Sequence, residues 1–315
     1  MAFSIKISKS LYKSQVLIYL KFMHNLVSEN ISGYQLLDSG FGKKLEIIAG
    51  ITCERPSPQA IWAPRLSESE WKKATSVCIR KSDGGGIWQH RGNKEPLDLM
   101  IEWEKLKFKL KFTSFGHCGV FFEQQAVWTK LLNETKKLEA EIGRPLKFLN
   151  LFGYTGCASL AVLSTGAEVF HVDSSKGVLA WGKENTELSK LDTKRIKFVQ
   201  EDVKAFVKHS LKKGFKYDAI LADPPSWGHG ANKELWEFDQ MIYELVTDCY
   251  NLLTREKSFF FLSSHTHGVQ SEALRNIMND HKAKKDVVAG ELGVRHANDS
   301  RVLPAGIYSL ATNII

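Results

Sequence analysis

Hydrophobic and polar positions divide the chain into two regions with different periodicities. From residue 123 onward, short apolar runs of strand length alternate with longer amphipathic stretches of helical period. This alternation is typical of a mostly parallel sheet with helices on both faces. The sequence therefore predicts an α/β fold for this region, in which ligands bind at the carboxyl ends of the strands.

The expected elements of the second region follow from these runs. We expect helices at residues 124–142, 157–164, 178–188, 203–211, 234–253 and 271–280. We expect strands at residues 147–151, 168–172, 197–200, 217–222, 258–262, 285–293 and 306–312. Gly143 and Pro145 should end the first helix.

The first region has a mixed pattern and predicts a small α+β domain over residues 34–115. We expect a strand at residues 44–52, a short helix from Ser67 to Val77 and a flexible loop at residues 84–86. Residues 98–112 predict a hairpin that turns near Glu104 and Lys105. The resulting division is a tail or uncertain start at 1–33, the small domain at 34–115 and the α/β domain at 116–315.

The second strand of this hairpin has a strict period of two. Apolar Leu106, Phe108, Leu110 and Phe112 alternate with Lys105, Lys107, Lys109 and Lys111. One interpretation is an edge strand that lysines protect from aggregation. The other is a cationic face that contacts phosphates. We favour the first.

Composition narrows the function classes. The formal net charge of +8 fits a polyanionic partner such as nucleic acid and equally fits plain solubility. The five cysteines are widely spaced and contain no CxxC, which argues against disulfides and a zinc cluster. No apolar run is long enough to span a bilayer, so we expect no membrane partner and a cytoplasmic location.

The N-terminus leaves two interpretations of its first 28 residues. They contain lysines and serines and no acidic residue, which fits an organelle transit peptide, but the arginine typical of one is absent. We favour a simple tail, or a natural start at Met23.

Glycines and acids follow the predicted strands. Gly153 and Gly156, in the sequence NLFGYTG, form a loop that opens a helix, although the dinucleotide fingerprint GxGxxG is not present. Asp173 ends the second strand, and Glu201-Asp202 the third. Either acid could cap the helix that follows it. Together, at three consecutive strand ends, these features favour an adenosyl cofactor, with the ribose at Asp173 and the adenine at Asp202.

Asp223-Pro224-Pro225-Ser226-Trp227 directly follows the fourth strand. Two prolines hold the backbone extended and remove two donors, so carbonyls near them should face outward as free acceptors. With the Asp223 carboxylate they could bind N–H groups of a base, on which Trp227 could stack. The alternative is a simple proline-rich turn.

The order FLNLFGYTG, HVD, QED and LADPPSW resembles class I S-adenosylmethionine-dependent methyltransferases. More closely, it is similar to the bacterial 23S ribosomal RNA large-subunit cytosine-5 methyltransferase family, in a shorter branch without the RNA-binding PUA domain. The motif GVFFEQ at residues 119–124 carries part of this resemblance. It covers about residues 36–315. It implies a Rossmann-like sheet, S-adenosylmethionine as cofactor and ribosomal RNA as partner.

The resemblance also implies residue roles. Catalytic roles would fall to Asp223, Pro224, Pro225 and Trp227. Cofactor-binding roles would fall to Glu123, Gln124, Phe152, Gly153, Gly156, Asp173, Ser174 and Asp202. No metal ligand is expected, because the His265-x-His267 pair lacks a third ligand in the sequence.

Cytosine-5 chemistry needs a thiolate, and the family's cysteine follows the fifth strand, where this chain reads SSHTH at residues 263–267. We therefore expect methylation of a base nitrogen. His265 and His267 could contact the target or carry a proton, but we favour the interpretation that they are loop histidines satisfied by their neighbours. Cys118 would be the first candidate thiol if carbon 5 were the target.

Alternative functions remain open from the sequence. They are a non-catalytic cofactor-binding RNA or assembly module, a methyltransferase acting on protein or a small molecule, and a nicotinamide oxidoreductase. The missing GxGxxG argues against the last.

Overall fold

The computed structural model describes residues 24–29, 31–80, 85–230, 234–254 and 257–314, and all structural statements concern these residues. The expectation about an organelle transit peptide falls largely on residues 1–23, which lie outside the described residues.

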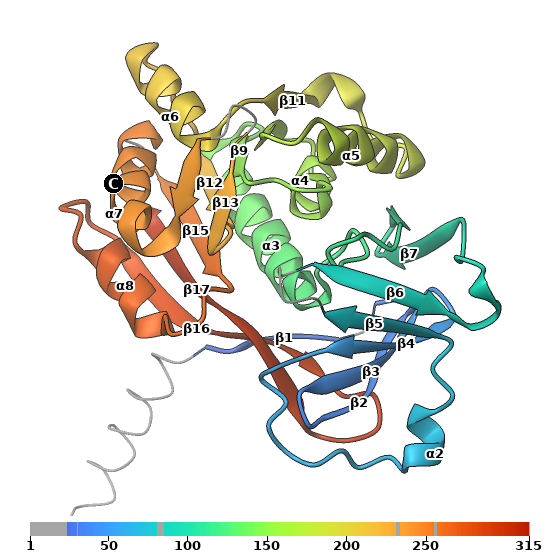
Figure 1. The fold of residues 1–315 in the computed structure, drawn as a ribbon. Coiled ribbons are helices and arrows are strands. Elements are labelled where there is room, and N and C mark those ends of the chain that lie inside the picture. Colours follow the sequence, from blue (N-terminus) through green and yellow to red (C-terminus); the bar gives the residue numbers. More distant parts are fainter. Residues whose placement is uncertain (1–23, 30, 81–84, 231–233, 255–256, 315) are drawn as a thin grey trace, which may run out of the picture.

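An eight-stranded sheet forms the larger part of the molecule (Figure 1). Its strand order is β1-β16-β17-β15-β12-β9-β10-β11. Strand β17 runs antiparallel to both neighbours, and the other paired strands are parallel, which confirms the predicted sheet with a C-terminal antiparallel strand. The strands are β1 (Leu26–Ser28), β9 (Lys147–Leu151), β10 (Glu168–Asp173), β11 (Ile196–Gln200), β12 (Ala219–Ala222), β15 (Ser258–Ser264), β16 (Asp286–Arg295) and β17 (Val302–Ile314).

Six helices follow the predicted positions closely. They are α3 (Gln125–Ile142), α4 (Cys157–Leu163), α5 (Lys176–Leu188), α6 (Val203–Lys212), α7 (Phe238–Leu252) and α8 (Ser271–Asn279). Gly143 ends α3 in the left-handed conformation, as expected.

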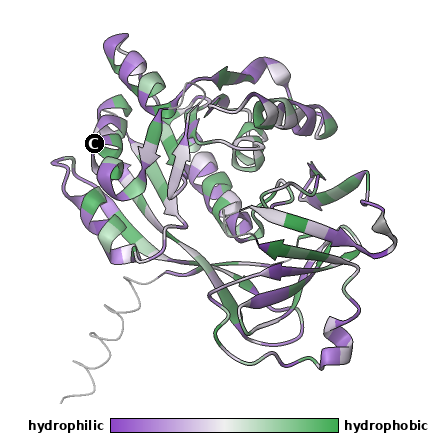
Figure 2. Ribbon diagram, viewed as in Figure 1, coloured by the Kyte–Doolittle hydropathy of each residue, from purple (hydrophilic) through white to green (hydrophobic). Residues whose placement is uncertain are grey.

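Two hydrophobic clusters lie on opposite faces of this sheet. Successive residues of one strand alternate between them: Phe148 packs in the cluster with α3 and α4, and Leu149 in the cluster with α6, α7 and α8. Figure 2 shows the inner strands as mostly hydrophobic and the helices as mixed. The sheet is therefore buried on both faces, and its exposed strand ends remain the place for ligands.

A five-stranded sheet with the order β2-β3-β4-β5-β6 makes up the smaller part (Figure 1). Its elements, with the short helix beside it, are β2 (Tyr34–Gly40), β3 (Lys43–Ile48), β4 (Ile51–Pro56), α2 (Glu68–Trp71), β5 (Ser76–Arg80) and β6 (Gly86–His90).

Two predictions for this part are wrong in detail. The single strand expected at 44–52 is a hairpin of β3 and β4, because Ala49 and Gly50 both have positive φ and form its turn. The helix expected to reach Val77 ends at Trp71, since the following residues pair with β4 and β6 as strand β5. The Ser67 side chain makes no cap hydrogen bond. Sheet pairing outweighed the local helical pattern.

The glycine loop expected at 84–86 is only partly described. Residue 84 lies outside the described residues, and Gly86 begins β6. A side chain at Gly86 would meet the Cys78 sulfur at 2.9 Å, so this glycine serves close packing within the sheet.

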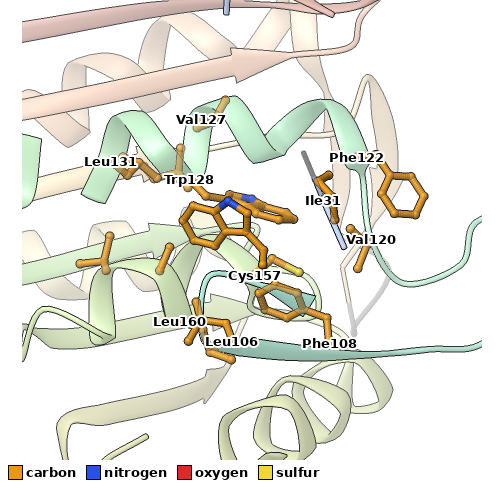
Figure 3. Close-up of a cluster of buried hydrophobic side chains, with 14 of the residues drawn as sticks. Ile31, Leu106, Phe108, Val120, Phe122, Val127, Trp128, Leu131, Cys157 and Leu160 are labelled. Carbon is orange, nitrogen blue, oxygen red and sulfur yellow. The ribbon is translucent and has the colours of Figure 1, made fainter. Parts of the chain in front are cut away.

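The predicted lysine hairpin is present as β7 (Leu99–Trp103) and β8 (Leu106–Leu110). Its apolar face packs on α3 and α4, where Phe108 meets Trp128 (Figure 3). Lys109 and Lys111 form ion pairs with Glu184 of α5, at 2.6 and 3.3 Å. The outer edge of β8 is thus occupied by another part of the chain.

Side chains of α5 also bind the backbone of β8. Asn185 Oδ1 accepts from the Lys109 amide, the Ser189 hydroxyl accepts from the Lys107 amide, and Trp181 Nε1 donates to the Lys109 carbonyl. We expected lysines to protect the edge of this strand from aggregation. The edge is indeed protected, but by hydrogen bonds from α5 and the residue after it.

The segment after Glu234, which we expected to begin a helix, forms a strand instead. Residues of β14 (Leu235–Glu237) pair with β13 (Trp227–His229), and α7 begins only at Phe238. The reason is local: Trp236 Nε1 donates to the Pro225 carbonyl at 2.6 Å and fixes this segment beside the proline motif.

Candidate functional site

Four neighbouring parallel strands, β12, β9, β10 and β11, end at the same edge of the large sheet. The predicted site residues follow these strands directly, with the loop 152–156 after β9, Asp173 at the end of β10, Asp202 after β11 and Asp223 after β12. The expected convergence of motifs at one sheet edge is therefore present.

The loop after β9 has an unusual backbone. Phe152 and Tyr154 have φ of 58° and 51°, which is rare for residues other than glycine and concentrates at functional sites. A side chain at Gly153 would lie 2.3 Å from the His171 ring. In this structure, the close approach that requires glycine is therefore to a buried histidine of β10.

Asp173 fixes this loop from the neighbouring strand. Its carboxylate accepts from the amides of Tyr154 and Ser175, at 3.0 and 2.9 Å. Burial raises the pKa of this carboxyl, against the lowering effect of the amides of Ser175, Tyr154 and Ser174. Asp173 thus organises the turn that contains Ser174, and the cap residue of α5 is Ser175.

Asp202 does cap the following helix, as the alternative interpretation had it. Its Oδ1 accepts from the Ala205 amide at 3.0 Å at the start of α6. Its Oδ2 faces the loop after β13, where a side chain at Gly230 would approach it to 3.2 Å.

A pocket lies between the β9 loop and the start of α3. Predicted residues that line it are Gln124, Phe152, Gly153, Gly156 and Asp223. Glu123, Asp173, Ser174, Asp202, Pro224, Pro225 and Trp227 are outside its lining. The structure therefore brings the loop glycines and Asp223 into one cavity and leaves the two other acids along the sheet edge.

Asn150 contributes an unpaired acceptor to this pocket. Its Nδ2 donates to the Ser159 hydroxyl at 2.9 Å, whereas its buried Oδ1 has no hydrogen-bond partner among the described residues. An orphaned buried acceptor is unfavourable and indicates a missing N–H donor. Sequence reasoning missed this residue, although a polar side chain within the apolar strand KFLNL was a usable signal.

Asp223 lies in a network of side chains from three elements. Gln124 Nε2 donates to its Oδ2 at 3.0 Å, and the Ser263 hydroxyl donates to its Oδ1 at 2.6 Å. Burial raises the pKa of Asp223, while His265 and these hydrogen bonds act in the opposite direction. The result is a half-buried carboxyl, held in place and able to accept a further hydrogen bond.

His265 borders this network. Its Nε2 lies 3.8 Å from Asp223 Oδ1 and 3.2 Å from Gln124 Nε2, and its Nδ1 is 2.7 Å from the Ala305 carbonyl. Burial would lower the pKa of His265, but the carboxylates of Asp223 and Glu123 raise it above the ordinary value. The interpretation of His265 as a site residue thus gains a geometric basis. Both His265 and His267 line a second cavity beside the pocket.

The proline motif differs from its prediction. The carbonyls of Pro225 and Ser226 are not free acceptors, because Trp236 Nε1 and the Phe238 amide donate to them. Among the acceptors of this motif, the Asp223 carboxylate borders the pocket. Trp227 is 59% exposed, and its ring makes an edge contact with His229, with centroids 4.6 Å apart; its stacking on a base stays a prediction.

The five cysteines are all buried, and none is in a disulfide. Cys118 donates to the Val120 carbonyl, and burial raises the pKa of its thiol. Burial likewise raises the pKa of Cys157 to about 12 and the pKa values of Cys53, Cys78 and Cys249. Each thiol is therefore neutral at physiological pH and unsuited to nucleophilic attack.

A second, larger cavity lies between the small sheet and the site. Phe121 lines both cavities and stacks near His265, with ring centroids 5.8 Å apart. Glu123, predicted to contact the cofactor, instead lines this second cavity, with Oε1 3.8 Å from His265 Nδ1. Phe121 belongs to the motif GVFFEQ, but nothing in the sequence indicated that its side chain lines both cavities.

Among the described residues, no three His, Cys, Asp or Glu side chains are grouped so as to bind a metal ion. No helix in the described parts of the chain combines the length and apolar character needed to cross a membrane.

Comparison with known proteins agrees with this geometry. A family model described as S-adenosylmethionine-dependent methyltransferase matches residues 58–249. The crystal structure of a SAM-dependent methyltransferase from Agrobacterium tumefaciens is 32% identical, with a TM-score of 0.86 over 92% of this chain and 93% of that one. A methyltransferase structure complexed with SAH shares the fold, at 16% identity and a TM-score of 0.69 over 96% of this chain and 80% of that one.

Curated relatives include two ribosomal RNA large subunit methyltransferases. The K/L protein of Shewanella sp. (strain MR-4) is 34% identical over 186 residues, which are 58% of this chain and 25% of that protein. The K protein of Neisseria meningitidis serogroup B is 27% identical over 211 residues, 66% of this chain and 56% of that protein. The chain thus spans about a quarter of the first relative and just over half of the second.

The match of the family model, together with the sheet order and the loop at the end of β9, shows that this chain belongs to the S-adenosylmethionine-dependent methyltransferase family.

Proposed function

We propose that the protein transfers a methyl group from S-adenosylmethionine to a nitrogen of an RNA base, with ribosomal RNA as the substrate. The observation that carries the proposal is the Asp223 network, which places a fixed acceptor beside a pocket suited to the cofactor. The ribosomal RNA large subunit methyltransferases among the relatives support the choice of substrate. That substrate fits the cytoplasmic location expected from the sequence.

The pocket residues fit the chemistry of the cofactor. Its methionine part carries an ammonium group, which matches the unpaired Asn150 Oδ1. We assign Phe152, Gly153 and Gly156 to the same part of the cofactor. When bound, the cofactor supplies an electrophilic methyl group on a positively charged sulfur.

The remaining cofactor roles lie along the sheet edge. We assign Asp173 and Ser174 to the ribose and Asp202 to the adenine, since Asp202 Oδ2 is not the atom that caps α6. Gln124 lines the pocket and closes it next to Asp223. Glu123 acts from the neighbouring cavity through His265.

Asp223 and the Pro224 carbonyl would hold the N–H groups of the target base, and Trp227 would stack on its ring. Pro225 serves indirectly, because its carbonyl fixes Trp236 and with it the β13–β14 hairpin. The bound cofactor would supply the methyl group to the base nitrogen held in this way. Any proton left on the nitrogen passes to Asp223, whose buried carboxylate has a raised pKa.

A nitrogen target is favoured over cytosine carbon 5 by the state of the cysteines. Attack at carbon 6 requires a thiolate, and burial keeps all five thiols protonated. At the end of β15 the chain instead presents Ser263, which is already engaged with Asp223.

The test is methyl transfer to ribosomal RNA from a strain that lacks this protein, followed by mass spectrometry of the nucleosides. A methylated guanine or adenine nitrogen, or cytosine amine, is the expected product. Label on cytosine carbon 5 would overturn the nitrogen assignment. Labelled product that resists ribonuclease would point to a protein or small-molecule substrate, and cofactor binding without any transfer to a non-catalytic module.

A further inference from the structure

The larger cavity joins the small sheet to the proposed methyl-transfer site. Lys44, Arg55 and Arg80 of β3, β4 and β5 line one side, and His265 lines the other. Phe121 separates this cavity from the cofactor pocket and belongs to both linings. A ligand in the larger cavity would therefore contact Phe121, and Asp223 lies in the pocket on the other side of that ring.

The small-sheet side of the cavity contains a fixed cation. Arg55 is buried, with its Nε and Nη2 donating to Glu46 at 2.7 and 3.0 Å. Its guanidinium lies over the Phe122 ring, 6.0 Å from the centroid. A guanidinium held in this way loses little conformational entropy on binding an anion.

The charges on this side do not cancel. Lys44 Nζ lies 3.0 Å from the same Glu46 carboxylate, so two cations share one buried anion. Arg80 adds a third cation at the end of β5. The carboxylate of Glu123 lies on the opposite side, beside His265. The small-sheet side is therefore suited to an anion.

An exposed aromatic ring lies in the same cavity. Phe115 is 69% exposed and belongs to the segment that links β8 to α3. An exposed phenylalanine is unfavourable in water unless something covers it. Cations combined with an exposed aromatic ring are typical of surfaces that bind single-stranded nucleic acid, where phosphates meet the cations and bases stack on the ring.

We propose that this cavity binds a single-stranded segment of the RNA substrate next to the target base. Its phosphates contact Arg55, Lys44 and Arg80, and one of its bases stacks on Phe115. This inference rests on the proposed function, because it takes RNA as the substrate. It adds the path of the strand, which runs from the small sheet past Phe121 to Asp223.

The test compares a double variant inside the cavity with a matched double variant outside it. Each of them loses one cationic side chain and one exposed aromatic ring. The first is Arg80→Gln with Phe115→Ala, which leaves the buried Arg55–Glu46 pair intact. The matched control is Lys213→Gln with Phe215→Ala, at the exposed end of α6 and outside the cavity lining. Phe215 is 52% exposed, so both variants remove a similar surface ring.

Binding of a fluorescent single-stranded RNA of roughly ten nucleotides would be followed by anisotropy at several salt concentrations. The cavity variant should bind about tenfold more weakly, with a salt slope smaller by about 0.7 for one lost phosphate contact. The control should bind like the wild type. Equal binding by all three proteins, or an equal loss in both variants, would overturn the inference.

Methyl transfer and cofactor binding by the same proteins separate the two proposals. If the cavity variant binds cofactor normally but shows a raised KM for RNA, both stand. If the wild type methylates RNA and the cavity variant does so with unchanged KM, only the cavity assignment fails. If the wild type binds RNA through the cavity but methylates no base, the proposed function fails and the cavity assignment stands.

Discussion

Asp223 accepts hydrogen bonds at both carboxylate oxygens and still borders the pocket. The Gln124 amide and Ser263 hydroxyl fix its position, so a substrate N–H would meet an acceptor that needs no reorganisation. An acid that merely followed β12 would not need two side chains to hold it. The two hydrogen bonds therefore indicate a functional role for the Asp223 carboxylate.

Asp223→Asn should spare cofactor binding and reduce methyl transfer by about 100-fold or more, because an amide is a poor proton acceptor. Ser263→Ala, which removes only one of the supporting hydrogen bonds, should cause a much smaller loss. Calorimetry with S-adenosylhomocysteine and single-turnover transfer would measure the two effects. An Asn variant with normal turnover would show that the target is held elsewhere.

Asp173→Asn should weaken cofactor binding by roughly 1–3 kcal/mol, as expected for a lost hydrogen bond to a charged group. The substitution also replaces one of two acceptors for the Tyr154 and Ser175 amides, so the loop should become less stable. Calorimetry and thermal unfolding of the same variant test both effects. Unchanged affinity would remove the ribose assignment and leave Asp173 with the loop alone.

The placement of the candidate residues at one sheet edge could be predicted from the sequence, because they follow apolar strands at short, recognisable distances; their roles stay predictions. Asn150 and Phe121 could not be assigned, since their roles depend on which side chains face them across the fold. The prediction of free carbonyls after Asp223 was wrong for the same reason. The donor to Pro225 is Trp236, eleven residues further along the chain, in a segment with a helical sequence pattern.

At the scale of elements, the docking of β8 onto α5 connects the hairpin with the cofactor loop. Asn185 is fully buried, accepts from the Lys109 amide and donates to the Thr155 carbonyl. One side chain therefore links β8, α5 and the loop after β9.

Asn185→Ala should destabilise the protein by about 2–3 kcal/mol, because it leaves two buried backbone groups without partners. It should also weaken cofactor binding by loosening the loop at Thr155. Ser189→Ala, at the exposed end of the same contact, should change stability by less than about 1 kcal/mol. Denaturant unfolding would measure both, and equal effects would contradict the role given to Asn185.

The pair of strands β3 and β4 should respond to acid through Glu46. Burial opposes its ionisation, yet Arg55 and Lys44 lower the pKa of Glu46 from 4.5 to about 2. The lowered folded-state pKa contributes stability that is present above about pH 4.5 and is lost as pH falls through about 2. The shift corresponds to roughly 3–4 kcal/mol at most.

Glu46→Gln should therefore reduce stability at neutral pH and flatten its decline between about pH 4.5 and 2. Glu54→Gln on the next strand is the control, because Glu54 pairs with the exposed Lys43 and such pairs contribute under about 1 kcal/mol. Denaturant unfolding at several pH values measures both. An unchanged pH dependence in the Glu46 variant would contradict the assignment.

Apart from the β13–β14 hairpin, strand and helix positions after residue 123 could be predicted within a few residues, because each of these elements keeps one periodicity. The β3–β4 turn could not, since apolar residues continue through it, and neither could the short end of α2, which depends on pairing with β4. Local patterns decide where elements form, and long-range pairing decides where they stop.

At the scale of the whole molecule, the division into a small and a catalytic domain stays a prediction that unfolding can test. One hydrophobic cluster contains Leu36 and Ile48 of the small sheet, Phe108 of the hairpin, Trp128 of α3 and Phe148 of the large sheet. In addition, β1, which precedes the small sheet in sequence, pairs with β16 of the large sheet. The two parts are thus joined both by packing and by the path of the chain.

We therefore expect calorimetry to show one unfolding transition for the whole chain, because neither part can unfold without exposing the shared cluster. Cofactor at about 100 times its Kd should stabilise the folded state by about 2.7 kcal/mol and move that single transition upward. NADH at the same concentration should leave it unchanged. Two separate transitions, of which the cofactor moves only one, would instead show that residues 34–115 and 116–315 fold as independent domains.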